Sequence, residues 1–330
     1  MPSAAQVKAL LQSHSSGDDE RFYAVALQVA AAEARNGHET LARDLRSIVD
    51  QAKTRTSESK ARFNVVQIAQ PMGEAAELLD SRLPEFSIKD LVLADSVRER
   101  VMRVIHEQRQ MSRLQAHGLR PRQRLLFTGP PGCGKTMTAS AIASELHLPL
   151  FVVRLDALIT RYLGESANKL RLIFDSVNQS RAVYLFDEFD SIGYSRDGGQ
   201  DVGEMRRVLN AFLVFIESMH SHSLVIAATN HGSRLDKALY RRFDDLIEFS
   251  LPGDDEIRQM IETRLQSVSA PKLGWQRIVK AARGLSFGEI GRACDDGMKQ
   301  AVMKETANVS TASLLAALNE RRLFLPPAET

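Results

Sequence analysis

The sequence predicts an α/β protein with a parallel sheet covered by helices on both faces. Short, almost continuously apolar segments alternate with longer helical ones from about residue 86, as in buried parallel strands joined by helices. After Pro252 the strand-like segments stop and helical periodicity remains, which predicts a small all-α domain. The chain has 330 residues, of which 44% are hydrophobic, enough for two or three structural units.

The alternation defines the individual elements. The predicted strands are 124–128, 150–154, 182–186 and 224–228. The predicted helices are 95–115, 135–146, 166–178, 202–219, 254–267, 275–283, 287–305 and 311–321. Three apolar stripes at helical spacing predict a further small helical domain at the N-terminus. The expected domains are therefore N-terminal helices (1–55), a polar linker (56–85), a large αβ unit (86–252) and a small helical unit (253–330).

Composition excludes several classes of protein. The formal net charge is +2 with 25% charged residues, so no strong field favours nucleic acid. No stretch approaches the roughly 20 apolar residues that span a bilayer, and the N-terminus does not resemble a signal peptide. Cys133 and Cys294 have no metal-binding spacing. We therefore expect a soluble cytoplasmic protein with no membrane partner.

A phosphate-binding loop follows the first predicted strand of the αβ unit. The segment Gly129-Pro130-Pro131-Gly132-Cys133-Gly134-Lys135-Thr136-Met137 fits G-x-x-x-x-G-K-[ST] and leads into a helix. Glycines let backbone N–H groups face phosphate oxygens, and the helix N-terminus favours their negative charge. We expect Lys135 to contact the β- and γ-phosphates of ATP and the Thr136 hydroxyl to bind Mg²⁺. The motif predicts a P-loop NTPase sheet, and the position of Cys133 predicts inhibition by thiol reagents.

Two acids end the apolar strand 182–186. Asp187 and Glu188 follow it directly, and the carboxyl ends of parallel strands gather at the ligand-binding edge of such a sheet. Asp187 is therefore expected to hold Mg²⁺ and Glu188 to polarise the attacking water. A solvated acidic turn is the simpler alternative, which the accompanying phosphate loop disfavours.

Two further motifs make a family resemblance specific. The strand 224–228 ends in Thr229-Asn230, and Arg241-Arg242-Phe243-Asp244 follows. With the phosphate loop and Asp187-Glu188, these motifs occur in the order and approximate spacing of an AAA-family ATPase of the AAA+ superfamily. The resemblance covers about residues 86–320, and the Arg-Arg-Phe form is most similar to the katanin and spastin branch.

The resemblance implies a site shared between subunits. Asn230 would be the sensor of the γ-phosphate and the lytic water, and Arg241 and Arg242 would be arginine fingers that reach the neighbouring subunit of a homo-hexameric ring. Guanidinium suits this role because it stays charged and grips two oxygens. The alternatives are a turn role for Asn230 and, for the arginines, a basic turn or an ion pair with Asp244-Asp245.

The resemblance also implies a substrate-binding pore. Tyr162, Leu163 and Gly164 match the aromatic-aliphatic-glycine tip that lines the pore of AAA translocases; a hydrophobic staple at a helix start is the alternative. The glycine-rich loop 195–201 is a second pore candidate or a surface loop. Residues 90–94 match the family's adenine loop loosely.

Two segments depart from the family pattern. The stretch Gly284–Ile290 resembles the Gly-x-Ser-Gly-Ala-Asp-Ile segment of the lid, but Phe287-Gly288 replaces Gly-Ala. The acidic Asp-Gly-Phe inter-subunit signal is replaced by Glu217-Ser218-Met219.

The predicted function is a Mg-ATP hydrolysing ring motor that remodels, unfolds or threads a protein or peptide client. The N-terminal helices would choose the client or an adaptor, or serve only packing. Two alternatives remain open: an ATP-controlled switch that regulates a separate effector such as a protease, and a DNA-acting AAA ATPase. The small net charge disfavours the second.

Overall fold

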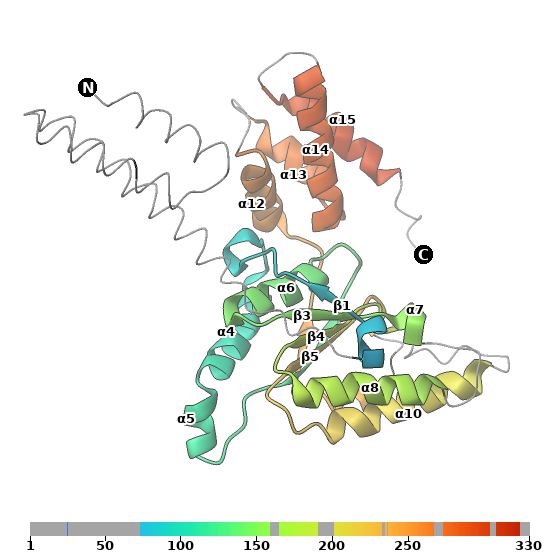
Figure 1. Ribbon diagram of the computed structural model, residues 1–330. Helices are drawn as coiled ribbons and strands as arrows, with labels where there is room; N and C mark the ends of the chain where they lie inside the picture. Colours follow the sequence, from blue (N-terminus) through green and yellow to red (C-terminus); the bar gives the residue numbers. More distant parts are fainter. Residues whose placement is uncertain are drawn as a thin grey trace, which may run out of the picture. The chain divides into compact units, whose positions relative to one another are not determined.

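The computed structural model describes residues 73–158, 165–190, 201–232, 237–266, 273–303 and 308–323, with Val25 and Leu235, and only the backbone of 73–74, 201–206 and 237–238. The predicted N-terminal helices and linker start, the Tyr162–Gly164 tip and the loop 195–200 lie outside the described residues. The chain divides into two units, Met1–Gln67 and Ile68–Thr330. The elements below all belong to the second unit (Figure 1).

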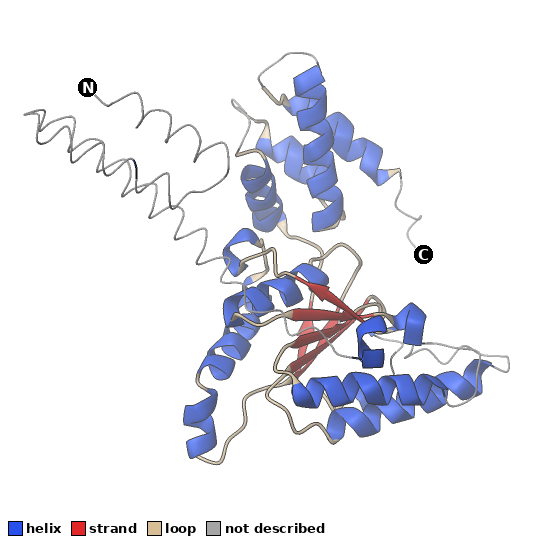
Figure 2. Cartoon of the chain, viewed as in Figure 1, coloured by secondary structure: helices blue, strands red, loops and turns tan. Residues whose placement is uncertain are grey.

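A six-stranded sheet forms the centre of the αβ region (Figure 2), with the order β1-β3-β4-β5-β2-β6. The strands are β1 (Leu79–Arg82), β2 (Arg124–Thr128), β3 (Leu150–Val153), β4 (Val183–Phe186), β5 (Leu224–Thr229) and β6 (Asp245–Glu248). Strands β2 to β6 are parallel, whereas β1 runs antiparallel to β3. The prediction for β2 is confirmed, and those for β3, β4 and β5 differ by one residue at one end.

Both edge strands were missed by the sequence analysis. Strand β1 lies inside the stretch 56–85 that was expected to be a linker, so the sheet begins earlier than predicted, with Leu79 opposite Val153. Strand β6 buries only one side chain, that of Ile247. Edge strands are short and face solvent on one side. Neither therefore carries the apolar run that identifies a central strand.

Helices cover both faces of the sheet (Figure 1). One face carries α4 (Asp95–Arg109) and α6 (Lys135–Leu146), and the other carries α8 (Glu165–Gln179) and α10 (Asp201–Glu217). Side chains along each strand alternate between the two cores, as strand geometry requires; in β4, Val183 and Leu185 join the α4–α6 side and Tyr184 and Phe186 the other. This confirms the predicted α/β layering.

Shorter segments complete the αβ region. They are the 3₁₀ helices η1 (Gly73–Glu77) and η2 (Ile88–Asp90) and the helices α5 (Met111–Ala116), α7 (Leu155–Leu158) and α11 (Lys237–Tyr240). The single helix predicted at 95–115 is two helices, because Gln110 leaves helical geometry between α4 and α5.

The small C-terminal region has its own core. It consists of α12 (Asp254–Arg264), α13 (Trp275–Ala282), α14 (Phe287–Met303) and α15 (Thr311–Arg322). All four begin where the sequence predicts. Capping explains two of these starts, since Glu256 accepts the Gly253 N–H before α12 and Ser310 accepts the Ser313 N–H at the start of α15. Ile261, Ile290, Cys294 and Leu318 are fully buried in this core.

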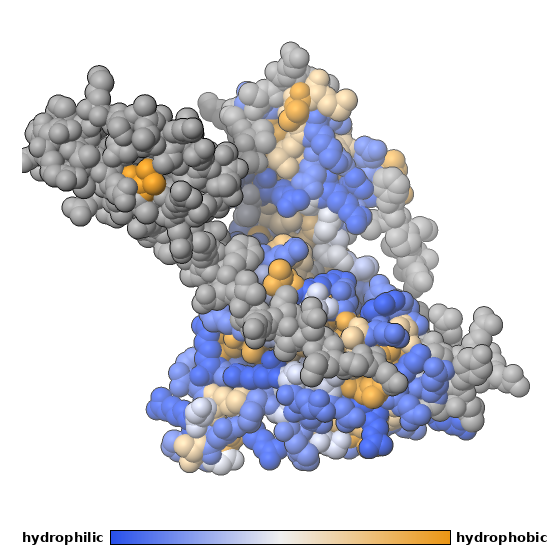
Figure 3. Space-filling view, in the orientation of Figure 1, coloured by the Kyte–Doolittle hydropathy of each residue, from blue (hydrophilic) through white to orange (hydrophobic). Residues whose placement is uncertain are grey.

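The described surface is mainly hydrophilic on the side drawn in Figure 3, with apolar residues scattered among the polar ones. Among the described residues, no helix is long and apolar enough to cross a membrane.

Candidate nucleotide-binding site

The phosphate loop takes a backbone conformation that glycine favours. The φ angles of Gly129, Gly132 and Gly134 are 141°, 75° and 92°, in the region that side chains rarely adopt. At Gly129 a Cβ atom would lie 2.0 Å from the carbonyl oxygen of Phe249. The loop therefore curls tightly against the segment after β6 before α6 begins at Lys135.

Lys135 stands at the centre of the site. Its Nζ atom donates to the carbonyl oxygens of Gly129 (2.7 Å) and Pro130 (2.9 Å) and to Oδ1 of Asn230 (2.9 Å). The residue is only 7% exposed. Burial lowers the pKa of Lys135, and the nearby carboxylates of Asp187 and Asp190 act in the opposite direction. All three ammonium protons are thus held by oxygens inside the loop region.

Thr136 and Asp187 meet as the sequence predicts. The Thr136 hydroxyl donates to Oδ2 of Asp187 at 2.6 Å. Their oxygens come from the first turn of α6 and from the end of β4, so they face each other across the loop. This donor set fits Mg²⁺, which binds few protein oxygens and keeps waters or phosphates as its other ligands.

Glu188 has a strained backbone. Its φ angle is 51°, one of two positive values among the described non-glycine residues, and its side chain is exposed. The Glu188 N–H donates to Oδ1 of Asp187 (3.0 Å), and the next residue, Phe189, donates its N–H to the Ala228 carbonyl (2.8 Å). Strained conformations of this kind cluster at functional sites. Glu188 is thus held in an exposed turn directly after β4.

Asn230 extends from the end of β5 toward Lys135. Besides accepting from Lys135, it donates its backbone N–H to Oδ1 of Asp190 at 3.4 Å, and the Thr229 hydroxyl donates to the same oxygen at 3.2 Å. Asp190 is the residue that sequence analysis missed. Its position three residues after Asp187 was the available signal, but the sequence analysis assigned it no role.

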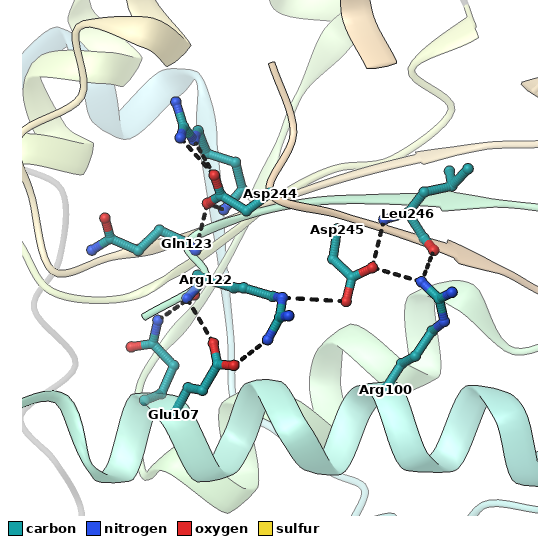
Figure 4. Close-up of polar contacts among 9 residues, drawn as sticks. Arg100, Glu107, Arg122, Gln123, Asp244, Asp245 and Leu246 are labelled. Atoms are coloured by element: carbon teal, nitrogen blue, oxygen red, sulfur yellow. Dashed lines mark hydrogen bonds and ion pairs between the residues drawn. The ribbon is translucent and has the colours of Figure 1, made fainter. Parts of the chain in front are cut away.

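The two arginines after α11 lie at the protein surface. Arg241 is exposed, and Nε of Arg242 is 2.8 Å from Oε1 of Glu217 at the end of α10. The alternative in which Arg241 and Arg242 form an ion pair with Asp244-Asp245 is not seen among the described residues. Other arginines hold these acids. Asp244 pairs with Arg124, and Asp245 lies between Arg100 and Arg122 (Figure 4).

A pocket opens beside the phosphate loop. It is lined by Leu93, Ala94, Val97, Cys133, Phe249, Ser250, Leu251, Pro252, Glu256 and Phe287. Leu93 and Ala94 belong to the predicted adenine loop. The start of α14 adjoins it, since the Gly288 N–H donates to the Gly132 carbonyl at 3.0 Å. Cys133 is buried, and burial raises the pKa of its thiol, so the expected reactivity toward thiol reagents is not supported.

Comparison with known proteins identifies the family. The model of the family described as "ATPase family associated with various cellular activities (AAA)" matches residues 125–251. The chain is also 35% identical over 315 residues to an uncharacterized AAA family ATPase of Sinorhizobium fredii, covering 95% of this chain and 94% of that protein. The chain belongs to the AAA family. Membership of this family implies that the protein binds ATP and hydrolyses it.

Two further relatives match the AAA ATPase over part of their length. One is named as a homolog of a 26S proteasome regulatory subunit in Methanothermobacter marburgensis, with 32% identity over 210 residues, 62% of this chain and 56% of that protein. The other is the ATP-dependent zinc metalloprotease FtsH 3 of Sphaerobacter thermophilus, with 29% identity over 242 residues, 72% of this chain and 50% of that protein. The matches thus span about half of each. None of these three names refers to katanin or spastin, so that branch is not confirmed.

Proposed function

We propose that this AAA ATPase hydrolyses Mg-ATP at the site built on Lys135, Thr136 and Asp187 and uses the energy to remodel, unfold or thread a protein client. The observation that carries the proposal is the convergence of these side chains with Asn230 at one edge of the sheet, at separations of 2.6 to 2.9 Å. That is the arrangement phosphoryl transfer needs, because catalysis there is mainly positioning and charge stabilisation.

Each side chain has a defined role in the proposed reaction. When ATP binds, its phosphate oxygens would replace the protein oxygens to which Lys135 donates, and backbone N–H groups of residues 129–137 would surround the phosphates. When bound, Mg²⁺ would be held by Thr136 and Asp187 and would neutralise phosphate charge. The exposed carboxylate of Glu188 takes up the proton of the attacking water, and Asn230 orients that water against the γ-phosphate.

The proposed assembly is a hexameric ring of identical subunits. Arg241 and Arg242 would act as arginine fingers on the neighbouring site, as in the katanin and spastin branch. Their surface positions support this, and the Glu217 carboxylate beside Arg242 provides a place to hold the guanidinium until a neighbour binds. Tyr162, Leu163 and Gly164 would grip an extended peptide in the pore.

Protein clients are favoured over nucleic acid by the comparisons. The related proteins are named for a proteasome regulatory subunit and a metalloprotease, and this chain carries a formal net charge of only +2. We therefore propose a peptide or protein client, or a separate effector such as a protease. A cytoplasmic location agrees with two cysteines that are both free and buried.

The test is to trap the ring with Glu188→Gln. The variant should retain ATP binding but lose turnover, since the amide cannot accept the water proton, and its size in ATP should be that of a hexamer. Client proteins should then co-purify with it, and wild-type ring should need continued turnover to release or unfold them. Turnover by Glu188→Gln equal to wild type would contradict the assigned chemistry. An effect that needs only ATP binding would identify the switch instead of the motor.

A further inference from the structure

The turn that carries Arg241 and Arg242 follows a helix that is too short to hold it in place. Helix α11 (Lys237–Tyr240) has four residues, and a single helical turn is not stable without tertiary contacts. The positions of the two arginines, which we call the arginine turn, therefore depend on what the residues beside them contact.

Contacts on both sides fasten the arginine turn to the αβ region. Before it, Leu239 is fully buried in the core that α8 and α10 cover. After it, Phe243 packs against the same core. The Asp244 carboxylate then accepts the backbone N–H groups of Gln123 and Arg124, both at 2.9 Å (Figure 4). Both ends of the turn are thus attached to the sheet and its core.

Tyr240 adds a hydrogen bond of a different kind. Its hydroxyl donates to the carbonyl oxygen of Gly232, two residues beyond Asn230. The same oxygen also accepts the Leu235 N–H at 3.1 Å, so it would keep a donor without the tyrosine. The Tyr240 side chain is itself only half-buried. The bond is therefore not needed to satisfy a buried polar group, and what it contributes is position.

Gly232 is a fixed anchor for this bond. A Cβ atom at Gly232 would lie 3.1 Å from the side chain of Thr128, so its backbone sits directly against the end of β2. This contact and the bond from Leu235 remain when the tyrosine hydroxyl is removed. Loss of the hydroxyl should therefore loosen the arginine turn without moving the strand ends that form the nucleotide site of the same chain.

We propose that the Tyr240 hydroxyl positions Arg241 and Arg242, so that it supports ATP hydrolysis in the neighbouring subunit and not in its own. The inference rests on the proposed arginine fingers. A guanidinium group must meet phosphate oxygens in a defined geometry, and a displacement of about 1 Å can cost up to about 10²-fold in rate. Tyr240 belongs to none of the motifs that carry the family resemblance, so its role is a feature of this sequence.

Tyr240→Phe tests the proposal because it keeps the ring and removes only the hydroxyl. The substitution is placed in one of two inactive variants that are then mixed. Glu188→Gln subunits lack the base but keep both arginines, whereas Arg242→Ala subunits keep the base but lack one finger. Turnover in mixed rings comes from Arg242→Ala sites that a Glu188→Gln neighbour completes. Tyr240→Phe can therefore sit on the side that donates the arginines or on the side that hydrolyses ATP.

The two placements should differ. In the Glu188→Gln subunit, Tyr240→Phe should lower the kcat of the mixed rings about tenfold and change KM for ATP less than about twofold. In the Arg242→Ala subunit it should leave kcat within about twofold of the parental mixture. Light scattering in ATP should show the same assembly in every mixture.

Tyr184→Phe in the Glu188→Gln subunit is the matched control. Tyr184 is fully buried in the same core, and its hydroxyl donates to the carbonyl oxygens of Ser176 and Ser180 at the end of α8. Its loss removes a tyrosine hydroxyl from the core without touching the arginine turn. The control should leave kcat of the mixed rings unchanged.

The outcomes separate the role of Tyr240 from the shared site. Equal losses from both placements would show that Tyr240 acts on its own site and would overturn the proposal. Unchanged turnover with either placement, or a loss that accompanies failed assembly, would overturn it as well. A parental mixture that recovers no turnover would contradict the shared site itself, and with it the role of Tyr240.

Discussion

Asp190 fixes the end of β5 through two hydrogen bonds from consecutive residues. Its Oδ1 atom accepts from the Thr229 hydroxyl and from the Asn230 backbone. Thr229 is fully buried, so no water molecule would replace Asp190 as the acceptor for its hydroxyl. Asn230 in turn contacts Lys135. Asp190 is thus a positioning residue for the proposed sensor, one step removed from the nucleotide.

Asp190→Ala should therefore impair turnover more than binding. With the end of β5 released, Asn230 no longer holds its place, and we expect kcat to fall at least about tenfold while ATP affinity changes less than about threefold. Leaving the Thr229 hydroxyl unpaired should also cost about 1–3 kcal/mol of stability. Asp190→Asn retains an acceptor oxygen and should restore most of both. Steady-state kinetics and chemical denaturation measure the two effects; an unaffected kcat would remove Asp190 from this role.

Both cysteines should resist modification in the native protein. Burial raises the pKa of Cys133, and it raises that of Cys294 to about 12, above the usual thiol value. Only the thiolate reacts, so its small fraction at pH 8 makes labelling slow and makes the rate increase as pH rises. A chromogenic disulfide reagent should label both thiols far more slowly than in denaturant. Rapid labelling of either thiol at pH 8 would contradict its burial.

At the scale of elements, the apolar pattern of the sequence predicts the strands that are buried on both faces and flanked by other strands. Strands β2 to β5 and the starts of helices α12 to α15 agree with the sequence because central strands and helix caps have strong local signals. The edge strands β1 and β6 do not, because solvent covers one side of each. The contact of Thr136 with Asp187 follows from parallel strands ending at one edge. The pairing of Arg242 with Glu217 could not be predicted from the sequence, because no pattern links the end of α10 to the turn after α11.

The aromatic contacts of α10 with β4 and with the turn after it offer a test of this layer. Phe212 is fully buried, with its ring centre 4.7 Å from that of Phe189 and 5.1 Å from that of Phe186. Phe212→Ala should lower the free energy of unfolding by about 3–5 kcal/mol because a large cavity remains. Phe212→Leu should cost less. Denaturant titration gives both values, and a loss under about 1 kcal/mol for the alanine variant would contradict the packing.

At the scale of the whole molecule, the site of one chain is incomplete for the proposed reaction. In the proposed reaction one chain supplies the phosphate-binding lysine (Lys135), a metal ligand (Asp187), a base (Glu188) and a sensor (Asn230). The proposed arginine fingers, Arg241 and Arg242, lie after α11 and would act on the site of another copy. An arginine finger contributes about 10³–10⁵ in rate. Hydrolysis should therefore depend on protein concentration, since assembly creates each active site.

Mixing two inactive variants tests this shared site most directly. Glu188→Gln lacks the base but retains both arginines, and Arg242→Ala retains the base but lacks one finger. Neither should hydrolyse ATP alone at more than about 1% of the wild-type rate. Mixed rings contain interfaces with an intact Glu188 and an intact Arg242, so ATP turnover should reappear and peak near equal proportions. No recovery in rings shown to be mixed, or full activity of Arg242→Ala alone, would contradict the account.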